Sequence, residues 1–448
     1  MTGLPAGWAW ATVGEVGNVM LGRQRAPKYH DGPHMRPYLR VKNVFEDRID
    51  LTDVKQMEFS DDEYQRYKLE PGDILLNEGQ SPELIGRPAM YRGELPGVCF
   101  TNSLIRFNPR TDIDGRYALY LFRHYLRSGR FRREARITTN IAHLSSQRFK
   151  SIEFPVPPLN EQRLIVAAIE ERFSRLDAAD ESLGRAEKRL AQLRGSLIGA
   201  AVGGSWPLTS LADVLVSLRN GLFVSRPAAE PPGTAIFRIS AVRPMSLDVE
   251  DVRYAPVSEG TCSDYLVAED DLLFTRYSGN AEYVGACARV PPLPRPTLHP
   301  DKLIRAVIDR TKAEPAFIEL SCAAGVTREQ IRARRKTTAG QVGIAGGQLR
   351  SVPIPLPPLE KQRAIVGKVS QQLSLIDAMH GATETAKRRS AGLRRSVLEL
   401  AFRGELVPQD PTDEPASALL ERIAAERSTD GNGPGLPSSP RRETIGAE

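Results

Sequence analysis

The sequence predicts a mixed α/β (α+β) fold in which two tandem mixed domains are each followed by a long helix. Three observations predict it. A Pro-rich phrase occurs twice, as FPVPPLNEQRLIV at 154–166 and IPLPPLEKQRAIV at 354–366, with eight of thirteen positions identical. Apolar residues at heptad spacing follow each copy, and short strand-like runs precede it. The chain therefore reads as a duplication, with one mixed domain and one helix in each half.

The duplication is clearest where residues 148–204 match residues 348–405 at an interval of 200 residues. Upstream the similarity fades, although YLRVKNV at 38–44 still corresponds to IFRISAV at 236–242. A repeating unit of this length does not fit a solenoid of short repeats. We expect five regions: a first mixed domain at 1–153, a central helical region at 154–204, a second mixed domain at 205–352, a C-terminal helical region at 353–404, and a short helix with a disordered tail at 405–448.

Each mixed domain is expected to combine short strands with a helix. Apolar runs bounded by Gly, Pro and Asn are typical of strands. Such runs are PYLRVKNV (37–44), GDILL (72–76), VCFTNSLIRF (98–107), AIFRIS (235–240), DLLFTRY (271–277) and KLIRAVI (302–308). Helices are expected at 115–129 in the first domain and at 314–326 in the second.

The two helical regions carry matching heptad seams, which predict that they pair as an antiparallel coiled coil with pseudo-two-fold symmetry. A helix of this length is a rod of roughly 60–70 Å and would act as a spacer. The Pro pair before each helix favours extended backbone, and Asn160 is a plausible N-cap. The first seam comprises Ile165, Ile169, Leu176, Ala179, Leu183, Ala186, Leu190, Leu193 and Leu197. The second comprises Ile365, Val369, Ile376, Met379, Thr383, Ala386, Ser390, Leu393, Val397 and Leu400.

The end of the chain is predicted to hold one more short helix. The segment ELVPQDPTDEPASALLERIAAERS after Gly404 has an acidic, Pro-rich lead and then an amphipathic pattern. The last twenty residues, TDGNGPGLPSSPRRETIGAE, are composed like a disordered tail.

Composition places the chain among ordinary globular proteins. It has 448 residues, 41% hydrophobic and 26% charged, which allows two or three domains. It contains no apolar run of membrane-spanning length and no signal-peptide pattern, so we expect a cytoplasmic location. The four cysteines lie far apart and are expected to be reduced, mostly buried thiols. The net charge of +6 suits a nucleic-acid-binding protein but is weak support by itself.

No motif for catalysis is found in the sequence. P-loop, HExxH and GxSxG patterns are absent, as are a methyltransferase cofactor loop and an NPPY-type tetrapeptide. The segment from Pro71 to Gly79 loosely resembles a nuclease carboxylate pattern, which the second half does not keep. We therefore expect no catalytic residue, no metal site and no cofactor bound by this chain.

Polar loops in the mixed domains carry side chains suited to base edges. Asn, Gln, Arg, Lys and Ser can bond to purine and pyrimidine edges. These residues differ between the halves while the helices stay alike, as two different sequence readers on one frame would. Each is also readable as an ordinary polar turn residue. The candidates are Arg40, Lys42, Asn43, Asn77, Gln80, Ser81, Arg136, Thr138, Asn140, Arg238, Ser240, Arg276, Ser278, Asn280, Lys336, Thr338 and Gln341.

Two arginine-rich segments are candidate phosphate-contacting surfaces. Residues 123–136 hold six arginines in fourteen positions, and residues 328–336 hold five basic residues in nine. Such surfaces supply affinity for DNA without reading its sequence. The alternative for both is a solvated helix face.

Taken together, these residues resemble the DNA-specificity subunit of type I restriction-modification systems. The resemblance covers nearly the whole chain. Its most specific parts are PVPPLNEQRLIV, PLPPLEKQRAIV and the ending AFRGELVPQDPTDEPASALLERIAAER at 401–427. One departure is LEKQ at 359–362, where the first copy has LNEQ, so a contact made by Glu161 need not exist at Lys361.

The resemblance implies a DNA-reading role without catalysis. The two mixed domains would be target-recognition domains, each reading half of a bipartite asymmetric site in double-stranded DNA. The helices would dock two methyltransferase subunits, which use S-adenosylmethionine, and translocase-nuclease subunits would join. Candidates for docking or spacing are Pro157, Pro158, Leu159, Gln162, Ile165, Leu176, Leu183, Leu190, Pro357, Pro358, Leu359, Gln362, Ile365, Ile376 and Leu393.

Two other functions stay open from the residues alone. A helical scaffold that binds only proteins would show no sequence-specific DNA binding with any partner. A fused enzyme with an unrecognised nuclease site would show activity as the purified chain.

Overall fold

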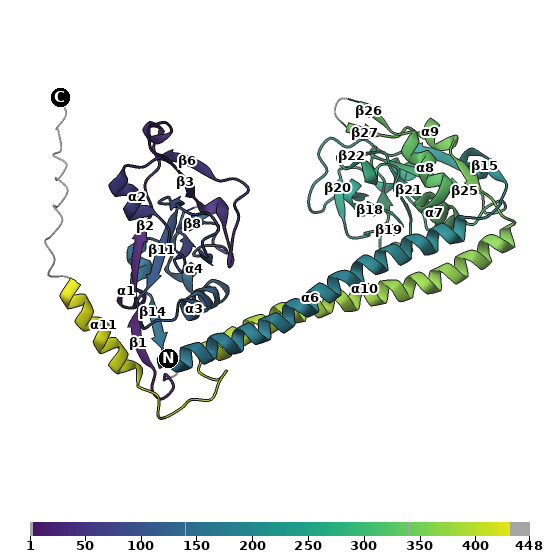
Figure 1. The fold of residues 1–448 in the computed structure, drawn as a ribbon. Coiled ribbons are helices and arrows are strands. Elements are labelled where there is room, and N and C mark those ends of the chain that lie inside the picture. Colours follow the sequence, from purple (N-terminus) through teal and green to yellow (C-terminus); the bar gives the residue numbers. More distant parts are fainter. Residues whose placement is uncertain (1–2, 139, 339–340, 431–448) are drawn as a thin grey trace, which may run out of the picture. The chain divides into compact units, whose positions relative to one another are not determined.

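The computed structural model describes residues 3–138, 140–338 and 341–430 (Figure 1). The chain divides into two compact units. The first comprises residues 1–181 and 387–448, and the second comprises Ser182–Ala386, so each unit contains one mixed domain and part of both long helices. Residues 431–448 of the tail that was predicted to be disordered lie outside the described residues.

The first unit is built on a four-stranded antiparallel sheet of order β2-β11-β7-β9 and a three-stranded sheet of order β10-β3-β6. Its strands are β1 (Ala9–Thr12), β2 (Gly17–Leu21), β3 (Met35–Leu39), β4 (Val44–Phe45), β5 (Arg48–Ile49), β6 (Lys55–Glu58), β7 (Ile74–Asn77), β8 (Gly79–Gln80), β9 (Pro88–Met90), β10 (Cys99–Phe100), β11 (Leu104–Pro109), β12 (Arg136–Thr138), β13 (Ile141–His143) and β14 (Glu153–Val156). Its short helices are α1 (Val13–Val16), α2 (Asp61–Tyr67), α3 (Gly115–Arg127), α4 (Arg130–Glu134) and α5 (Ser146–Lys150).

The second unit repeats this design with sheets of order β16-β25-β21-β23 and β20-β17-β24. Its strands are β15 (Leu208–Ser210), β16 (Leu215–Asn220), β17 (Thr234–Phe237), β18 (Val242–Arg243), β19 (Ser246–Leu247), β20 (Val252–Ala255), β21 (Leu272–Thr275), β22 (Tyr277–Ser278), β23 (Cys287–Arg289), β24 (Thr297–Leu298), β25 (Leu303–Ile308), β26 (Lys336–Thr338), β27 (Gln341–Gly343) and β28 (Pro353–Pro355). Its short helices are α7 (Pro315–Ala323), α8 (Gly325–Ala333) and α9 (Gly346–Arg350).

Each mixed domain buries its core between the four-stranded sheet and its main helix. In the first unit Phe122 of α3 packs edge-to-face on Phe107 of β11, with ring centroids 5.0 Å apart. Helix α3 begins where the Asp114 carboxylate accepts hydrogen bonds from the first-turn amides. Each predicted run contains a strand, but Val41–Asn43 and Ile239–Ala241 form short 3-10 helices where strand was expected. The helix expected at 115–129 is α3, and the one expected at 314–326 is α7, which already ends at Ala323. The four cysteines are free and buried.

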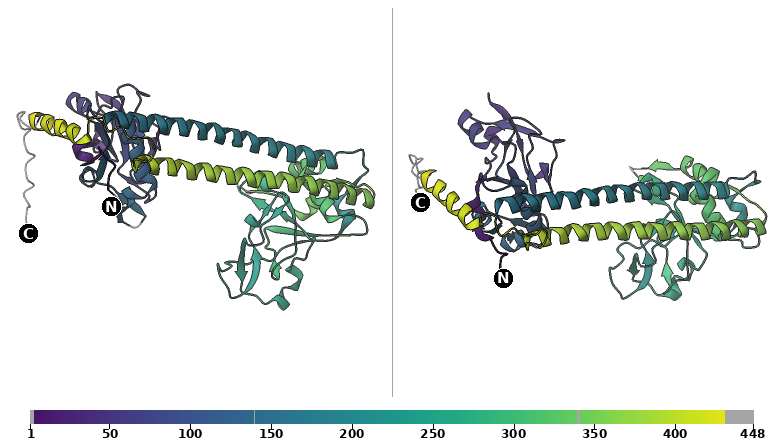
Figure 2. Two further views of the ribbon diagram at one scale, coloured as in Figure 1. Left: turned by 90° about the horizontal axis from the view of Figure 1, so that it is seen from below. Right: turned by 60° about the horizontal axis from the view of Figure 1, so that its bottom comes forward.

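The predicted long helices are α6 (Leu159–Val202) and α10 (Leu359–Phe402), of 44 residues each. They run antiparallel and side by side in both units (Figures 1 and 2). In the first unit Arg394 forms ion pairs of 2.8 Å with Asp177 and with Asp180. In the second unit Arg194 lies 2.6 Å from Asp377, at positions shifted by the same 200 residues. The mixed α/β fold with two long antiparallel helices is confirmed, while the pseudo-two-fold placement of the halves stays a prediction.

The heptad seam is only partly correct. Leu190, Ile376 and Val397 are buried as expected. Four large apolar seam residues are exposed and do not close the seam: Leu193 (55%), Leu393 (54%), Met379 (49%) and Leu400 (37%). A straight helix drifts by about 20° per heptad relative to a strict seven-residue repeat, which turns some seam positions away from the contact.

The C-terminal segment folds back onto the first unit. Helix α11 (Ala416–Asp430) begins where the Ala416 amide donates to the Gly7 carbonyl at 2.9 Å. Leu419 and Ile423 are buried in the same core as Trp8. The predicted short helix is therefore confirmed. Among the described residues, no helix has the length and apolar character needed to cross a membrane.

Candidate nucleic-acid interface

Each unit displays a small three-stranded sheet at its surface. In the first unit it has the order β12-β13-β8, so the β12–β13 hairpin pairs with a strand that leaves the core sheet at Asn77. In the second unit β26-β27-β22 has the same arrangement. We call the hairpins the first ribbon (136–143) and the second ribbon (336–343), and Figure 1 labels β26 and β27 of the second.

The first ribbon is unusually exposed for a pair of strands. Arg136, Ile137 and Thr138 are all exposed, and Ile137 and Ile141 expose 46% and 52% of their surface. Ala142 anchors the ribbon in the core, but core packing does not explain the exposed side chains around it. The DNA major groove admits a two-stranded β-ribbon, and there arginine binds guanine and apolar groups contact thymine methyls.

The second ribbon presents different side chains on the same backbone. Lys336, Thr337 and Gln341 are exposed. The side chain of Thr338 and residues 339–340 lie outside the described residues. The two units thus offer similar ribbons with different hydrogen-bonding groups.

In each unit a loop leaves one strand of the core sheet, pairs with the ribbon and returns to the core sheet at a glycine. We call residues 78–85 the first loop and residues 276–284 the second loop. Gly86 and Gly285 close them with φ of +71° and +68°, and their amides donate to the Asn77 and Thr275 carbonyls at 2.9 and 2.8 Å. A Cβ at Gly86 would lie 2.5 Å from the Phe131 ring, and one at Gly285 would lie 2.3 Å from Ile331.

Apart from Thr338, the loops and ribbons contain ten of the sequence candidates, each within its own unit. Gln80 of β8 pairs with Ala142 of the first ribbon, and Ser278 of β22 pairs with Val342 of the second. Arg276 is the first residue of the second loop, and its guanidinium lies 4.8 Å from the Tyr277 ring centroid. These candidates are Gln80, Ser81, Arg136, Thr138, Asn140, Arg276, Ser278, Asn280, Lys336 and Gln341.

The predicted base-reading role is wrong for two asparagines, because both are buried. Asn77 is 0% exposed at the end of β7, and Asn43 is 1% exposed. The Asn43 amide donates to the carbonyls of Asp50 and Asp53 at 2.9 and 3.1 Å, so it holds a turn. A polar residue after a strand reads the same in sequence whether it faces solvent or a turn.

The neighbouring basic candidates are occupied by carboxylates. Arg40 and Lys42 both bind Asp53, at 2.7 and 2.9 Å, and hold the pKa of that carboxyl below its usual range. The second unit repeats the pair, since Arg238 lies 3.0 Å from Asp251 and Ser240 donates to the same carboxylate. Because the side chains of Lys42 and Arg238 are 68% and 50% exposed beside these carboxylates, a DNA-contacting role for them stays a prediction.

Half of the arginine segment 123–136 is used inside the protein. Arg123 and Arg127 donate to Glu46 at 3.0 and 2.9 Å. Arg130 binds Glu153 at 2.5 Å, and this hydrogen bond holds the pKa of Glu153 below its usual range. For these three arginines a phosphate-contacting role is wrong, whereas Arg132, Arg133 and Arg136 are exposed and stay candidates.

The basic segment 328–336 is also largely used internally. Arg328 is buried, and Arg332 lies 2.7 Å from Glu282 of the second loop. Lys336 remains exposed on the second ribbon. The prediction of a broad phosphate-binding surface is therefore wrong for Arg328.

The glutamines after the repeated Pro pair hold the junction between domain and helix. Gln162 accepts from the Asp114 amide at 2.9 Å and donates to the Pro157 carbonyl at 3.1 Å. Gln362 repeats both contacts with Glu314 and Pro357, each at 2.8 Å. Both side chains are fully buried, so we correct their role from subunit docking to an internal contact, called the Gln latch.

The difference between Glu161 and Lys361 has the predicted consequence. The Glu161 carboxylate is buried and accepts a 3.0 Å hydrogen bond from the Trp8 indole. Lys361 is exposed. Asn160 is not the N-cap, because α6 begins at Leu159 and the Asn160 amide instead donates to Asp413. Sequence reasoning missed the role of Trp8, although Trp206 stands at the matching place at the start of the second domain.

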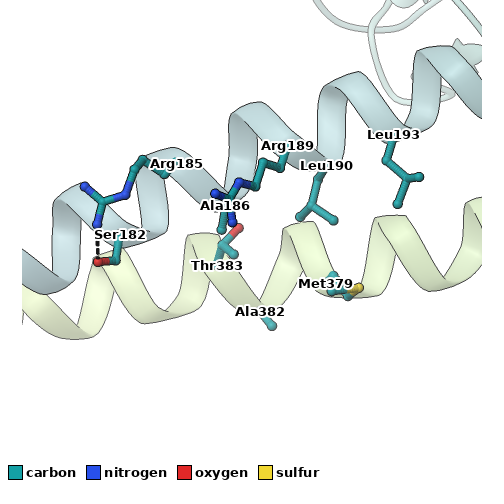
Figure 3. A pocket seen from close by; sticks show the side chains of 9 residues that line it. All are labelled: Ser182, Arg185, Ala186, Arg189, Leu190, Leu193, Met379, Ala382 and Thr383. Carbon is teal, nitrogen blue, oxygen red and sulfur yellow. Dashed lines mark hydrogen bonds between the residues drawn. The ribbon is translucent and has the colours of Figure 1, made fainter.

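The remaining docking candidates lie along the helices and their starts. Pro157, Pro158 and Pro357 are buried, whereas Pro358 is exposed. In the second unit a hollow of about 750 Å³ lies along α6 and α10 (Figure 3). Small side chains there leave Leu193 and Met379 exposed beside Arg185 and Arg189. The residues lining it are Ser182, Arg185, Ala186, Arg189, Leu190, Leu193, Met379, Ala382 and Thr383.

Comparison with known proteins finds relatives that match nearly the full length of the chain. A family model described as the type I restriction modification DNA specificity domain matches residues 5–182. The chain is 30% identical over 460 residues to the type I restriction enzyme EcoKI specificity subunit of Escherichia coli (strain K12), covering 96% of this chain and 97% of the relative. It is 26% identical over 458 residues to the StySPI specificity subunit of Salmonella potsdam, covering 96% and 97%.

Solved structures with a similar fold have lower sequence identity. A chain from a structure of the type I R-M system gives a TM-score of 0.70 at 17% identity, covering 90% of this chain and 100% of that one. The HsdS subunit from Thermoanaerobacter tengcongensis gives 0.50 at 19% identity, covering 90% and 98%. At these identities the likeness establishes the fold alone.

Proposed function

The chain belongs to the family of type I restriction enzyme specificity subunits, and from this premise we propose how its two units read DNA. Each ribbon with its adjoining loop contacts one half of a bipartite, asymmetric site in double-stranded DNA. The complete chain thereby directs methylation and restriction by associated subunits to that site.

One observation carries this proposal: the two units keep the same exposed ribbon but not the same side chains on it. Arg136, Ile137 and Ile141 of the first ribbon stand where Lys336, Thr337 and Gln341 stand in the second. Conserving an exposed backbone while changing its polar groups suits two readers of different base sequences. Phosphate contacts then set affinity, and a few base contacts set specificity.

Two readers in one chain also gain from being linked. Once one unit holds its half-site, the other meets its own half-site at high effective concentration. Reading from one face of the duplex favours half-sites about one helical turn, roughly 34 Å, apart. We propose that α6 and α10 set this gap.

For partners, we propose two methyltransferase subunits and translocase-nuclease subunits. The helices α6 and α10 are the proposed docking elements. The chain itself is proposed to contribute no catalytic group, metal or cofactor, because its sequence carries no motif for one. S-adenosylmethionine would be bound by the methyltransferase. The cytoplasm, where the DNA lies, is the proposed location.

Mapping of modified DNA tests the proposal. The chain is co-expressed with the methyltransferase encoded beside it, and modified adenines are located by sequencing. We expect one bipartite motif, of which one half changes when residues 1–150 are replaced from a relative and the other when residues 205–350 are replaced. A motif that is uninterrupted, or that does not respond half by half, would contradict the proposal. A helical scaffold would give no motif, and a fused enzyme would act without partners.

A further inference from the structure

A buried arginine lies beneath the second loop. Arg328 of α8 is 7% exposed. Its guanidinium donates to the main-chain carbonyls of Glu282 at 2.6 Å, Gly285 at 3.0 Å and Val284 at 3.4 Å. The side chain therefore binds three carbonyls within four residues of loop backbone.

Burying a guanidinium is unfavourable unless its N–H groups are satisfied. The Arg328 hydrogen bonds are charge-assisted and stronger than those between neutral groups. Burial lowers the pKa of Arg328 from its ordinary value, because it disfavours the charged guanidinium. A neutral residue would fill this place at lower cost if only packing were needed.

Two more arginines from the same segment hold the same stretch of loop. Arg335 donates to the Ala281 carbonyl, and Arg332 pairs with the Glu282 carboxylate at 2.7 Å. Residues 281–285 are thus bound by three arginines. The front of the loop is bound to the second ribbon, because Tyr277 and Ser278 pair with Gly343 and Val342.

Among the residues of the first unit that the structure describes, this arrangement is not found. Phe131 and Ile331 both pack against the loop glycines, which makes Ser128 the position equivalent to Arg328. In the described part of the first unit, the arginine contact to the first loop is Arg132 to Glu83 at 3.8 Å, with side chains 57% and 67% exposed.

We propose that Arg328 is a positioning residue that fixes the second loop against the second ribbon and thereby sharpens reading of the second half-site. This inference rests on the proposed function. A loop already held in its DNA-bound shape loses less freedom on binding, so mismatched bases are less easily accommodated. The first half-site, read beside a less constrained loop, is expected to tolerate more base substitutions.

The test measures base discrimination at each half-site separately. The methyltransferase complex containing the full chain is supplied with a library of sites, each with one base substituted, and modification rates are obtained by sequencing. We expect Arg328→Met to lower discrimination at the second half-site by about tenfold, on the order of one good base contact, and to leave the first half-site unchanged. Arg335→Met should have a smaller effect in the same direction.

The matched control is Arg334→Met. Arg334 is on the same segment, but its guanidinium donates to the main-chain carbonyls of Gln330 and Ser351, so we assign it neither to the phosphate surface nor to the loop. It should change neither half-site. Thermal unfolding shows whether each variant folds, and if Arg328→Met does not, Arg335→Met decides.

Unchanged discrimination at the second half-site in the folded variants would overturn the inference, as would an equal loss at both half-sites. A wild-type complex that modifies no bipartite site would refute the proposed function and this inference with it. A bipartite wild-type site with unaffected variants refutes this inference alone.

Discussion

The two units share their backbone design but are stabilised at different places. At the helix junction of the first unit, Trp8 binds Glu161 and α11 adds to the core. Under the loop of the second unit, Arg328 binds three carbonyls. Features that depend on backbone geometry are common to both units: the loop glycines and the Gln latches. Duplication has thus kept the geometry and changed the contacts that support it.

The largest expected effect tests what the units share. Gly86→Ala and Gly285→Ala each force a Cβ against Phe131 or Ile331 in a left-handed backbone conformation. We expect each to lower the free energy of unfolding by about 2–4 kcal/mol. Urea unfolding followed by far-UV circular dichroism measures it. Gly129→Ala is the control, because its φ is +73° but nothing lies within 4 Å, so it should cost about 1 kcal/mol. Equal losses at all three positions would show that the clash is relieved.

A smaller effect tests the difference at the junctions. Trp8→Phe removes the donor to the buried Glu161 carboxylate and should cost about 2 kcal/mol beyond the lost packing. Trp206→Phe faces no matching carboxylate, since Lys361 is exposed, and should lose less than about 1 kcal/mol. The same unfolding measurement compares the two. Equal losses would mean that the Trp8 hydrogen bond adds nothing measurable.

The helix ion pairs should differ in the same direction. Arg394 has a side chain 14% exposed and binds two aspartates, whereas Arg194 is 30% exposed and binds Asp377, which is 64% exposed. We expect Arg394→Met to cost about 1 kcal/mol and Arg194→Met about 0.5 kcal/mol or less. At high salt both losses of unfolding free energy should be smaller, and the loss for Arg194→Met should decrease most. A larger loss for Arg194→Met would reverse the comparison.

The smallest effect concerns pH. Burial raises the pKa of Glu161 above its ordinary value. The folded state therefore binds this proton more tightly than the unfolded state, and the free energy of unfolding falls as pH rises from the unfolded-state pKa through the folded-state pKa. Glu161→Gln should lack this fall while keeping an acceptor for Trp8. Unfolding midpoints across this pH range test it, with Lys361→Gln as the exposed control. Parallel profiles for wild type and Glu161→Gln would contradict the assignment.

The elements that sequence could predict are those written in local patterns. Heptads and the repeated Pro-rich phrase predicted α6 and α10, and the charge change at Lys361 predicted the lost junction contact. The burial of Asn77 and Arg328 could not be predicted, because a polar residue in a turn or basic segment looks alike whether it faces solvent or backbone carbonyls. The pairing of Arg123 and Arg127 with Glu46 joins residues 77 and 81 positions apart, a distance at which no periodicity operates. The sequence indicated single residues of the ribbons as candidates, but it did not predict that they pair as hairpins.

The Gln latch has a consequence for how such genes change over time. Gln162 and Gln362 each bind two main-chain groups. One is an amide of the DNA-reading domain, at Asp114 or Glu314. The other is the carbonyl of a proline inside the repeated phrase. Main-chain groups are the same in every sequence, so this fastening does not depend on which side chains a reader carries. A genetic crossover within the codons of the repeated phrase would join a foreign reader to a resident helix with its attachment intact. A new DNA specificity can then be acquired by exchanging a whole domain, without further substitutions to restore the contact between domain and helix.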